Sequence, residues 1–181
     1  MLVNYRGKIP ILGRDVFLAV GSVVAGDVVI GDRSSVWYHA LVRGDLMPIR
    51  IGEETNIQDG AILHVTHDHW PCHVGNRVTI GHGAIVHACT IEDECLIGMG
   101  AIILDGAVVE KGSLVAAGAV VRPGFRVPSG QLVAGNPAQI KRPLKPEEIQ
   151  GILNSAQEYL KLAKEYLGPR DYSTIGEQGM E

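Results

Sequence analysis

Aliphatic residues recur every six positions along most of this 181-residue chain. The first run is Leu18, Val24, Ile30, Val36 and Val42, followed after a short insertion by Ile51, Ile57 and Leu63. After a break at residues 65–73, the run resumes at Val74, Ile80 and Val86, skips one residue, and continues in steps of six from Ile91 to Val133. A period of six fits neither an amphipathic helix nor the alternation of a simple strand. It is typical of a parallel β-helix, in which each hexapeptide forms one short strand and a corner.

The predicted fold is therefore mainly β, with a hexapeptide-repeat β-helix domain over residues 1–142 in which three hexapeptides make one triangular coil. Each aliphatic residue of the series is expected to point inward. Successive coils stack at about 4.8 Å, so equivalent positions form columns along three flat faces. The composition agrees, because 23 glycines and only 5% aromatic residues suit a fold with many tight turns and small interior side chains.

From Pro146 onward the pattern changes to that of an amphipathic helix. One stripe contains Ile149, Ile152, Leu153, Ala156, Leu160, Ala163 and Leu167. Pro146 in the first turn, with Glu147 and Glu148 beside it, is typical of a helix N-terminus. We expect a helix over residues 146–167 that packs on the prism and caps it, within a segment 143–181 that belongs to the same domain. The last stretch, 168–181, is expected to be loosely ordered.

Charge and composition narrow the possible partners. Lys and Arg number 16 against 20 Asp and Glu, a formal net charge of -4, so no basic field exists to hold a phosphate backbone and no nucleic-acid partner is expected. Polar residues interrupt the N-terminus and no 18-residue apolar run occurs, so we expect no membrane partner and a cytoplasmic protein. The three cysteines, Cys72, Cys89 and Cys95, lack CxxC spacing and are expected to be packed free thiols.

All seven histidines lie between positions 39 and 87. In the six-residue register, His64 and His87 occupy the second place of hexapeptides on one face, one coil apart. They should stack in a column at strand spacing and point outward. His82 occupies the third place of a hexapeptide on the adjacent face, so it cannot easily meet the other two within one chain.

A neighbouring copy could supply the third histidine. Three prisms around a threefold axis would place one face of each subunit against the adjacent face of the next, which builds three equivalent sites. Three neutral imidazoles with a fourth position left to water describe an open, catalytic zinc site. The alternative is that outward histidines simply line an interface or the surface.

Three runs resemble the gamma-class carbonic anhydrases: L-V-R-G-D from Leu41, N-I-Q-D-G from Asn56 and I-G-H-G-A-I-V-H-A-C from Ile80. The similarity spans roughly residues 9–167. It implies a left-handed coil, a homotrimer, and a metal held by His64, His82 and His87, with His82 donated by the neighbouring chain. Zinc is the implied metal, and ferrous iron and cobalt are alternatives that accept the same ligands.

The resemblance also implies roles for residues around the metal. Gln58 is expected to hydrogen-bond metal-bound water or substrate, with Asn56 orienting it, since an amide both donates and accepts. Tyr159 in the C-terminal helix is expected to reach the site, with core packing as the alternative. Charged contacts between subunits are implied for Arg43, Asp45 and Asp59.

The implied activity is the reversible hydration of carbon dioxide to bicarbonate by a metal-bound hydroxide. The chain departs from the archetype, because no acidic shuttle loop occurs between Asp45 and Asn56. The residues that could carry protons instead lie in the 65–73 insertion and are His67, Asp68, His69 and His73.

Three other functions remain open from the sequence. They are thioester hydrolysis at the same metal, acyl transfer from an acyl-CoA by a hexapeptide acyltransferase, and a non-catalytic metal-binding trimer. Metal content separates acyl transfer from the others. Assays of carbon dioxide hydration and thioester hydrolysis separate the remaining possibilities.

Overall fold

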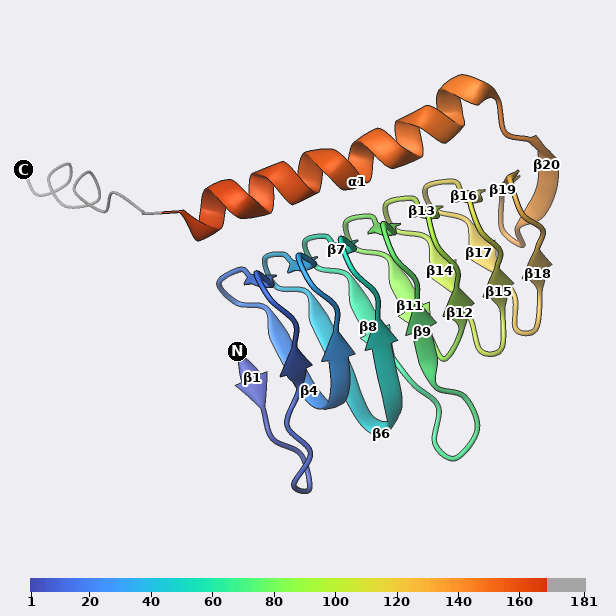
Figure 1. The fold of residues 1–181 in the computed structure, drawn as a ribbon. Coiled ribbons are helices and arrows are strands. Elements are labelled where there is room, and N and C mark those ends of the chain that lie inside the picture. Colours follow the sequence, from blue (N-terminus) through green and yellow to red (C-terminus); the bar gives the residue numbers. More distant parts are fainter. Residues whose placement is uncertain (169–181) are drawn as a thin grey trace, which may run out of the picture.

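The computed structural model describes residues 1–168, and residues 169–181, on which most of the expected loose tail falls, lie outside the described part. Short strands stack as the coils of one solenoid, and a single helix runs along it (Figure 1). One sheet contains β1 (Leu2–Val3), β2 (Ile11–Leu12), β4 (Val23–Ile30), β6 (Leu41–Ile51), β8 (Ile62–His64), β9 (Cys72–Val74), β11 (Ile85–His87), β12 (Thr90–Ile91), β14 (Ile102–Ile103), β15 (Val108–Val109), β17 (Val120–Val121) and β18 (Arg126–Val127). The other contains β3 (Phe17–Leu18), β5 (Ser35–Val36), β7 (Asn56–Ile57), β10 (Thr79–Ile80), β13 (Leu96–Ile97), β16 (Leu114–Val115), β19 (Gln131–Ala134) and β20 (Gln139–Pro143).

Strand pairing follows the coils. Each short strand pairs in parallel with the strand one coil away, and only the terminal β20 runs antiparallel, to β19. The fold class predicted from the six-residue period, mainly β with stacked parallel coils and one C-terminal helix, is therefore confirmed. The division of the chain at residue 142 stays a prediction.

The interior is a column of aliphatic side chains. Every member of the six-residue series from Val24 to Val133 is buried, with Ile80, Ile97 and Ile103 at 0% exposure. Burying one such side chain contributes about 1.5–3 kcal/mol, so the repeated column is the main source of stability. Leu18 is the exception and is only partly buried, because it lies in the first coil of its face and no further coil covers it.

The two interruptions of the period have different structures. The insertion between Val42 and Ile51 is absorbed by β6, a long strand that pairs with β4 through a register shift between Gly26 and Val28. In the 65–73 insertion, a loop leaves the coil and is closed by an antiparallel bridge between Thr66 and Trp70, and the chain rejoins the sheet at Cys72 in β9. Both interruptions lie beside the histidine column.

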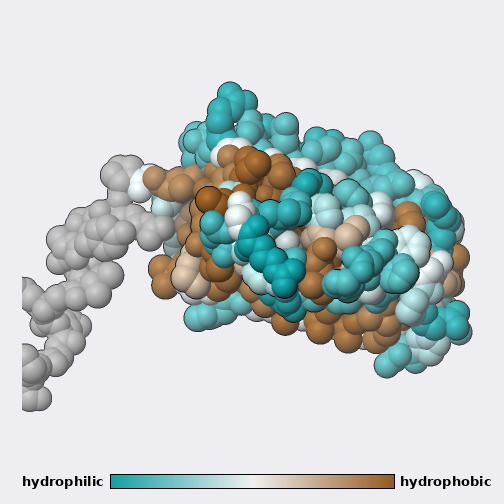
Figure 2. Space-filling model, turned by 90° about the horizontal axis from the view of Figure 1, so that it is seen from below, coloured by the Kyte–Doolittle hydropathy of each residue, from teal (hydrophilic) through white to brown (hydrophobic). Residues whose placement is uncertain are grey.

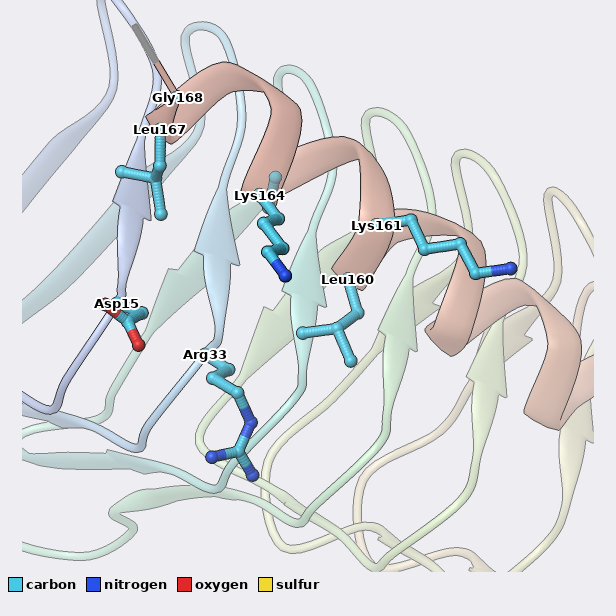
Figure 3. Close-up of a pocket in the computed structure, with 8 residues that line it drawn as sticks. Asp15, Arg33, Leu160, Lys161, Lys164, Leu167 and Gly168 are labelled. Carbon is cyan, nitrogen blue, oxygen red and sulfur yellow. The ribbon is translucent and has the colours of Figure 1, made fainter.

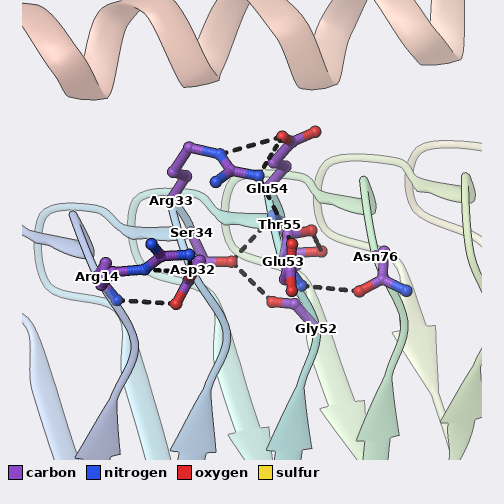
Figure 4. Close-up of polar contacts among 9 residues, drawn as sticks. All are labelled: Arg14, Asp32, Arg33, Ser34, Gly52, Glu53, Glu54, Thr55 and Asn76. Carbon is purple, nitrogen blue, oxygen red and sulfur yellow. Dashed lines mark hydrogen bonds and ion pairs between the residues drawn. The ribbon is translucent and has the colours of Figure 1, made fainter.

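A ladder of polar side chains links the coils at the corner beneath the helix (Figure 4). Arg14 donates to Asp32 at 2.8 Å, and Arg33 donates to Glu54 at the same distance. Inside the corner, the Ser34 hydroxyl donates to the Gly52 carbonyl at 2.7 Å. Exposed ion pairs of this kind add about 0–1 kcal/mol each, so they align neighbouring corners rather than dominate stability.

The helix α1 (Pro146–Leu167) has the predicted bounds and packs on β3, β5, β7 and β10. Its own residues Ile152, Ala156 and Ala163 are buried. Its aromatic residues join a cluster around Trp37, whose ring centroid lies 5.3 Å from that of Tyr159. The expected stripe is too long, because Ile149 and Leu167 are 44% and 48% exposed. These two lie near the helix ends, beyond the stretch that contacts the four strands.

The surface outside the helix is mixed. Seen from below, hydrophobic residues form several separate patches among polar ones (Figure 2). Met1, Leu2, Ile9 and Ile11 are exposed at the first coil, where the solenoid has no further coil to cover it. The helix described here is not long and apolar enough to cross a membrane.

Glu148→Gln should destabilise the start of α1 in a pH-dependent way. The Arg142 guanidinium, and then the Lys145 backbone N–H, lower the pKa of Glu148 from 4.5 to about 2. A lowered carboxyl pKa contributes stability above pH 4.5 that is lost as the pH falls towards 2. We expect the substitution to lower the midpoint of thermal unfolding at neutral pH, followed by circular dichroism, and the difference from wild type to shrink in acid. Glu147→Gln is the control, since Glu147 is 71% exposed and its carboxylate lies as far as 4.0 Å from Lys145 Nζ. Equal effects of the two substitutions would contradict the assignment.

Candidate metal centre

His64 and His87 form a stacked pair. They are register partners on the parallel strands β8 and β11, so the predicted column is confirmed. His64 Nδ1 lies 3.2 Å from His87 Nε2. Two nitrogens bound at 2.0–2.1 Å to one tetrahedral ion would lie about 3.3 Å apart. The pair therefore has the spacing of two ligands of a single metal.

The other nitrogen of each ring faces a carboxylate. His64 Nε2 lies 3.0 Å from Asp45 Oδ1, and His87 Nδ1 lies 3.2 Å from Asp105 Oδ2. An ionised carboxylate only accepts hydrogen bonds, so each ring places its N–H there. The two facing nitrogens then both carry lone pairs and cannot hydrogen-bond to each other. A carboxylate behind each imidazole is the arrangement found around metal-ligating histidines.

Electrostatics keep the first of these rings neutral. Burial is the largest influence on His64 and lowers its pKa; the Asp45 hydrogen bond opposes this, and the charge of Arg43 adds to it. Burial acts to raise the pKa of Asp45, but hydrogen bonds from His64 and Arg43 outweigh it and lower the pKa overall. At neutral pH Asp45 is thus an ionised carboxylate and His64 a neutral imidazole, which is the form of histidine that binds metal.

His82 lies apart from this pair, beyond the end of β10. Its Nδ1 contacts Asp59 Oδ2 at 2.9 Å, and its Nε2 lies 3.4 Å from the Tyr159 hydroxyl. Its side chain is 44% exposed. Among residues 1–168, no group of three His, Cys, Asp or Glu side chains is placed to hold a metal within one chain. As the register argument predicted, one chain does not bring His82 to His64 and His87, and the three-histidine site stays a prediction that requires a second copy.

Gln58 is fixed behind His82 by a chain of polar contacts. It is 5% exposed, and its Oε1 accepts the His82 backbone N–H at 3.2 Å. Its Nε2 donates to Asn56 Oδ1 at 3.1 Å, and Asn56 Nδ2 donates to Thr79 Oγ1 at 3.0 Å. Asn56 thus contacts Gln58 as its expected role requires, and that orienting role stays a prediction. The role of Gln58 towards water or substrate stays a prediction.

Tyr159 combines the two alternatives considered for it. Its hydroxyl contacts His82, and its ring packs edge-on against Trp37. Burial, followed by the nearby charge of Asp59, raises the pKa of Tyr159, so the hydroxyl stays protonated and can donate. The helix thereby reaches His82 through this side chain.

The residues expected at the subunit interface make contacts within the chain as well. Arg43 Nη1 forms an ion pair with Asp45 Oδ2, in addition to the hydrogen bond that Asp45 accepts from His64. Asp59 contacts His82. Their expected contacts with a second subunit stay predictions.

The four proposed proton carriers lie outside the histidine pair. His67 and Asp68 form an ion pair at 2.7 Å with both side chains largely exposed. No hydrogen bond or ion pair in the described part of the chain joins these two, His69 or His73 to a predicted ligand.

Two residues of the centre escaped the sequence analysis. Asp105 supports His87, and Thr66 donates to the other oxygen of Asp105. Extending the histidine column one coil further reaches Leu104, since Val86 pairs with Ile103, and Asp105 is the next residue. No sequence signal marks Thr66, because its loop has no period.

The hollows beneath the helix lie elsewhere. A cavity of about 610 Å³ is lined by Asp15, Arg33, Leu160, Lys164 and Leu167, among others (Figure 3). None of the predicted site residues lines it. The chemistry is therefore assigned to the histidine centre.

The fold and its histidine column define the chain as a hexapeptide-repeat protein. A sequence profile described as bacterial transferase hexapeptide (six repeats) matches residues 88–123. A crystal structure of a hexapeptide transferase family protein from Anaplasma phagocytophilum has 42% identity and a TM-score of 0.88, covering 92% of this chain and 98% of that one.

Curated relatives narrow this class to one family. A carbonic anhydrase of Geobacillus kaustophilus is 39% identical over 92% of this chain and 91% of its own. Gamma carbonic anhydrase 2, mitochondrial, of Arabidopsis thaliana is 46% identical over 90% of this chain. The chain belongs to the gamma carbonic anhydrase family. It spans about 60% of the length of the Arabidopsis relatives it matches.

Proposed function

We propose that the chain is a metal-dependent carbonic anhydrase that works as a homotrimer and hydrates carbon dioxide reversibly. The metal, zinc or alternatively ferrous iron or cobalt, would be held by His64 and His87 of one subunit and His82 of the next. The observation that carries the proposal is the pair of facing ring nitrogens of His64 and His87, with a carboxylate behind each ring. The names of the relatives support the reaction.

The donor set suits such an ion. Three neutral imidazoles leave one position open, and a metal bound there supplies activated water, since coordination lowers the pKa of water towards 7. On the third ligand, Asp59 holds the Nδ1 proton of His82, so Nε2 keeps its lone pair and now accepts from Tyr159. All three rings therefore have one nitrogen held by a carboxylate and one directed away from it.

The remaining residues bind and orient. Gln58 uses one N–H on Asn56, and its amide has a second N–H to offer a substrate oxygen. Asp45 and Asp105 keep the ring protons of His64 and His87 away from the facing nitrogens. Proton transfer to solvent through His67, Asp68, His69 or His73 stays a proposal.

The test is a combined measurement on protein purified without oxygen. We expect a trimer with about one metal per subunit that hydrates carbon dioxide, loses the activity on chelation, and regains it with zinc, ferrous iron or cobalt. Metal content, oligomer mass and stopped-flow hydration are the three readouts. A metal-free monomer that is fully active would contradict both the site and the reaction.

Acyl transfer is the second candidate, favoured by the transferase descriptions of the matching profile and of the Anaplasma structure. It predicts turnover of an acyl-CoA with an amine or alcohol acceptor that survives chelation. If the protein binds metal but hydrolyses thioesters, or catalyses neither reaction, the proposed metal site stands and the proposed substrate is wrong.

A further inference from the structure

Asp105 is the carboxylate that joins His87 to the 65–73 loop. Its Oδ2 lies 3.2 Å from His87 Nδ1, and its Oδ1 accepts a hydrogen bond from the Thr66 hydroxyl. Thr66 follows His64 by two residues in the chain. The loop therefore begins just after His64, and its residue Thr66 contacts the carboxylate that supports His87.

The loop has a second contact at the same place. Thr66 N–H donates to the Trp70 carbonyl at 3.3 Å, which closes the loop. The Trp70 ring lies against Gly106, where an added Cβ would stand 3.4 Å from its Cζ2 atom. Thr66 thus contacts Asp105, and Trp70 contacts the next residue, Gly106.

The two histidines of the pair have equivalent supports. Behind His64, Asp45 uses one oxygen on the ring and gives the other to Arg43. Behind His87, Asp105 uses one oxygen on the ring and gives the other to Thr66. In both cases the outer group holds the carboxylate, so the carboxylate cannot turn away from its imidazole.

We propose that Asp105 is a positioning residue for His87 and that Thr66, delivered by the 65–73 loop, positions Asp105. This inference rests on the proposed function, because it treats His87 as a metal ligand. Asp105 fixes the tautomer of His87 with the proton on Nδ1, which leaves Nε2 to face His64. The insertion that breaks the six-residue period therefore completes the support of the metal centre.

Metal affinity of the full-length chain, measured by chelator competition, separates this role from simple packing. Asp105→Asn should weaken binding by about 10–100-fold, the usual effect of removing a partner behind a ligand. Thr66→Val removes the hydroxyl but keeps the shape, and it should weaken binding by up to about 10-fold, whereas Thr66→Ser keeps the hydroxyl and should remain close to wild type. If Thr66 only packed, Val would be harmless and Ser would be the worse variant. Thr90→Val, in the neighbouring strand β12, is the matched control and should bind as wild type does.

The tautomer itself gives a second readout that needs no metal. Nitrogen-15 spectra of the ring nitrogens at about pH 8, where imidazoles are neutral, report which nitrogen carries the proton. Wild type and Thr66→Ser should show His87 protonated on Nδ1. In Asp105→Asn, Thr66 holds the amide oxygen, so the amide nitrogen faces His87 and donates, and the proton should move to Nε2. The His87 signals are assigned with His87→Gln.

Failure of this inference and failure of the proposed function give different results. An unchanged His87 tautomer in Asp105→Asn, or equal metal affinity in Thr66→Val and Thr66→Ser, overturns the positioning role while the three-histidine site stands. If His64→Ala and His87→Ala bind metal as tightly as wild type, the proposed site is wrong, whatever the tautomer shows.

Discussion

His82→Ala is expected to abolish both metal binding and carbon dioxide hydration while leaving the trimer assembled. The side chain is 44% exposed and lies outside the aliphatic column, so its removal does not disturb the core. It supplies one of three ligands in the proposed site. Since even partners behind a ligand change affinity by about 10–100-fold, loss of a ligand should exceed about 100-fold. Metal analysis, stopped-flow hydration and oligomer mass are the measurements.

His73→Ala is the control for metal content. His73 is an exposed histidine on β9, and its register partners are Arg50 and Thr90 rather than a predicted ligand. We expect His73→Ala to retain its metal. Loss of metal in both variants would point to a general effect of removing surface histidines and would contradict the assignment of His82.

Gly26→Ala, a substitution within β4, is expected to destabilise the fold strongly. Gly26 has φ +79°, and a Cβ there would stand 2.4 Å from the carbonyl oxygen of Gly44 in the next coil. The left-handed conformation costs a residue with a Cβ about 1–2 kcal/mol, and the collision adds about 1–3 kcal/mol. We expect a loss of about 2–5 kcal/mol in the free energy of unfolding, followed by urea denaturation at fixed protein concentration.

Gly112→Ala separates the two contributions. Gly112 has φ +67° and nothing within 4 Å of the position its Cβ would take. This variant should lose only the conformational part, about 1–2 kcal/mol. Equal losses in the two variants would show that the close approach of the β4 and β6 backbones has no cost. The same approach sets the position of Asp45, which follows Gly44 and supports His64.

The sequence is most informative where a contact lies in the repeat register. A parallel coil has one register, so the six-residue period alone places the aliphatic residues from Val24 to Val133 in the core. The same register places His64 beside His87 and separates both from His82. Helix capping signals give the start of α1 because Pro146 and the acidic first turn act locally.

Contacts across corners and loops could not be predicted in this way. Thr66 and Asp105 are 39 residues apart, and their contact depends on the path of a loop that has no period. The pairing of Asp45 with His64 also escaped, because the insertion in β6 shifts the register just beyond Asp45. Exposure of Leu18 and Leu167 depends on where coils and helix stop covering them, which residue spacing does not specify.

The shared site between subunits is the central claim, and co-expression of two inactive variants tests it most directly. His82→Ala subunits keep His64 and His87, whereas His64→Ala subunits keep His82, so each variant alone should lack metal and activity. If equal amounts of the two variants assemble at random, about a quarter of the interfaces over all trimers combine an intact pair with an intact His82. We predict that co-expression restores about that fraction of the wild-type metal content and hydration rate. Mixed trimers that remain as inactive as the separate variants would contradict a site built from two subunits.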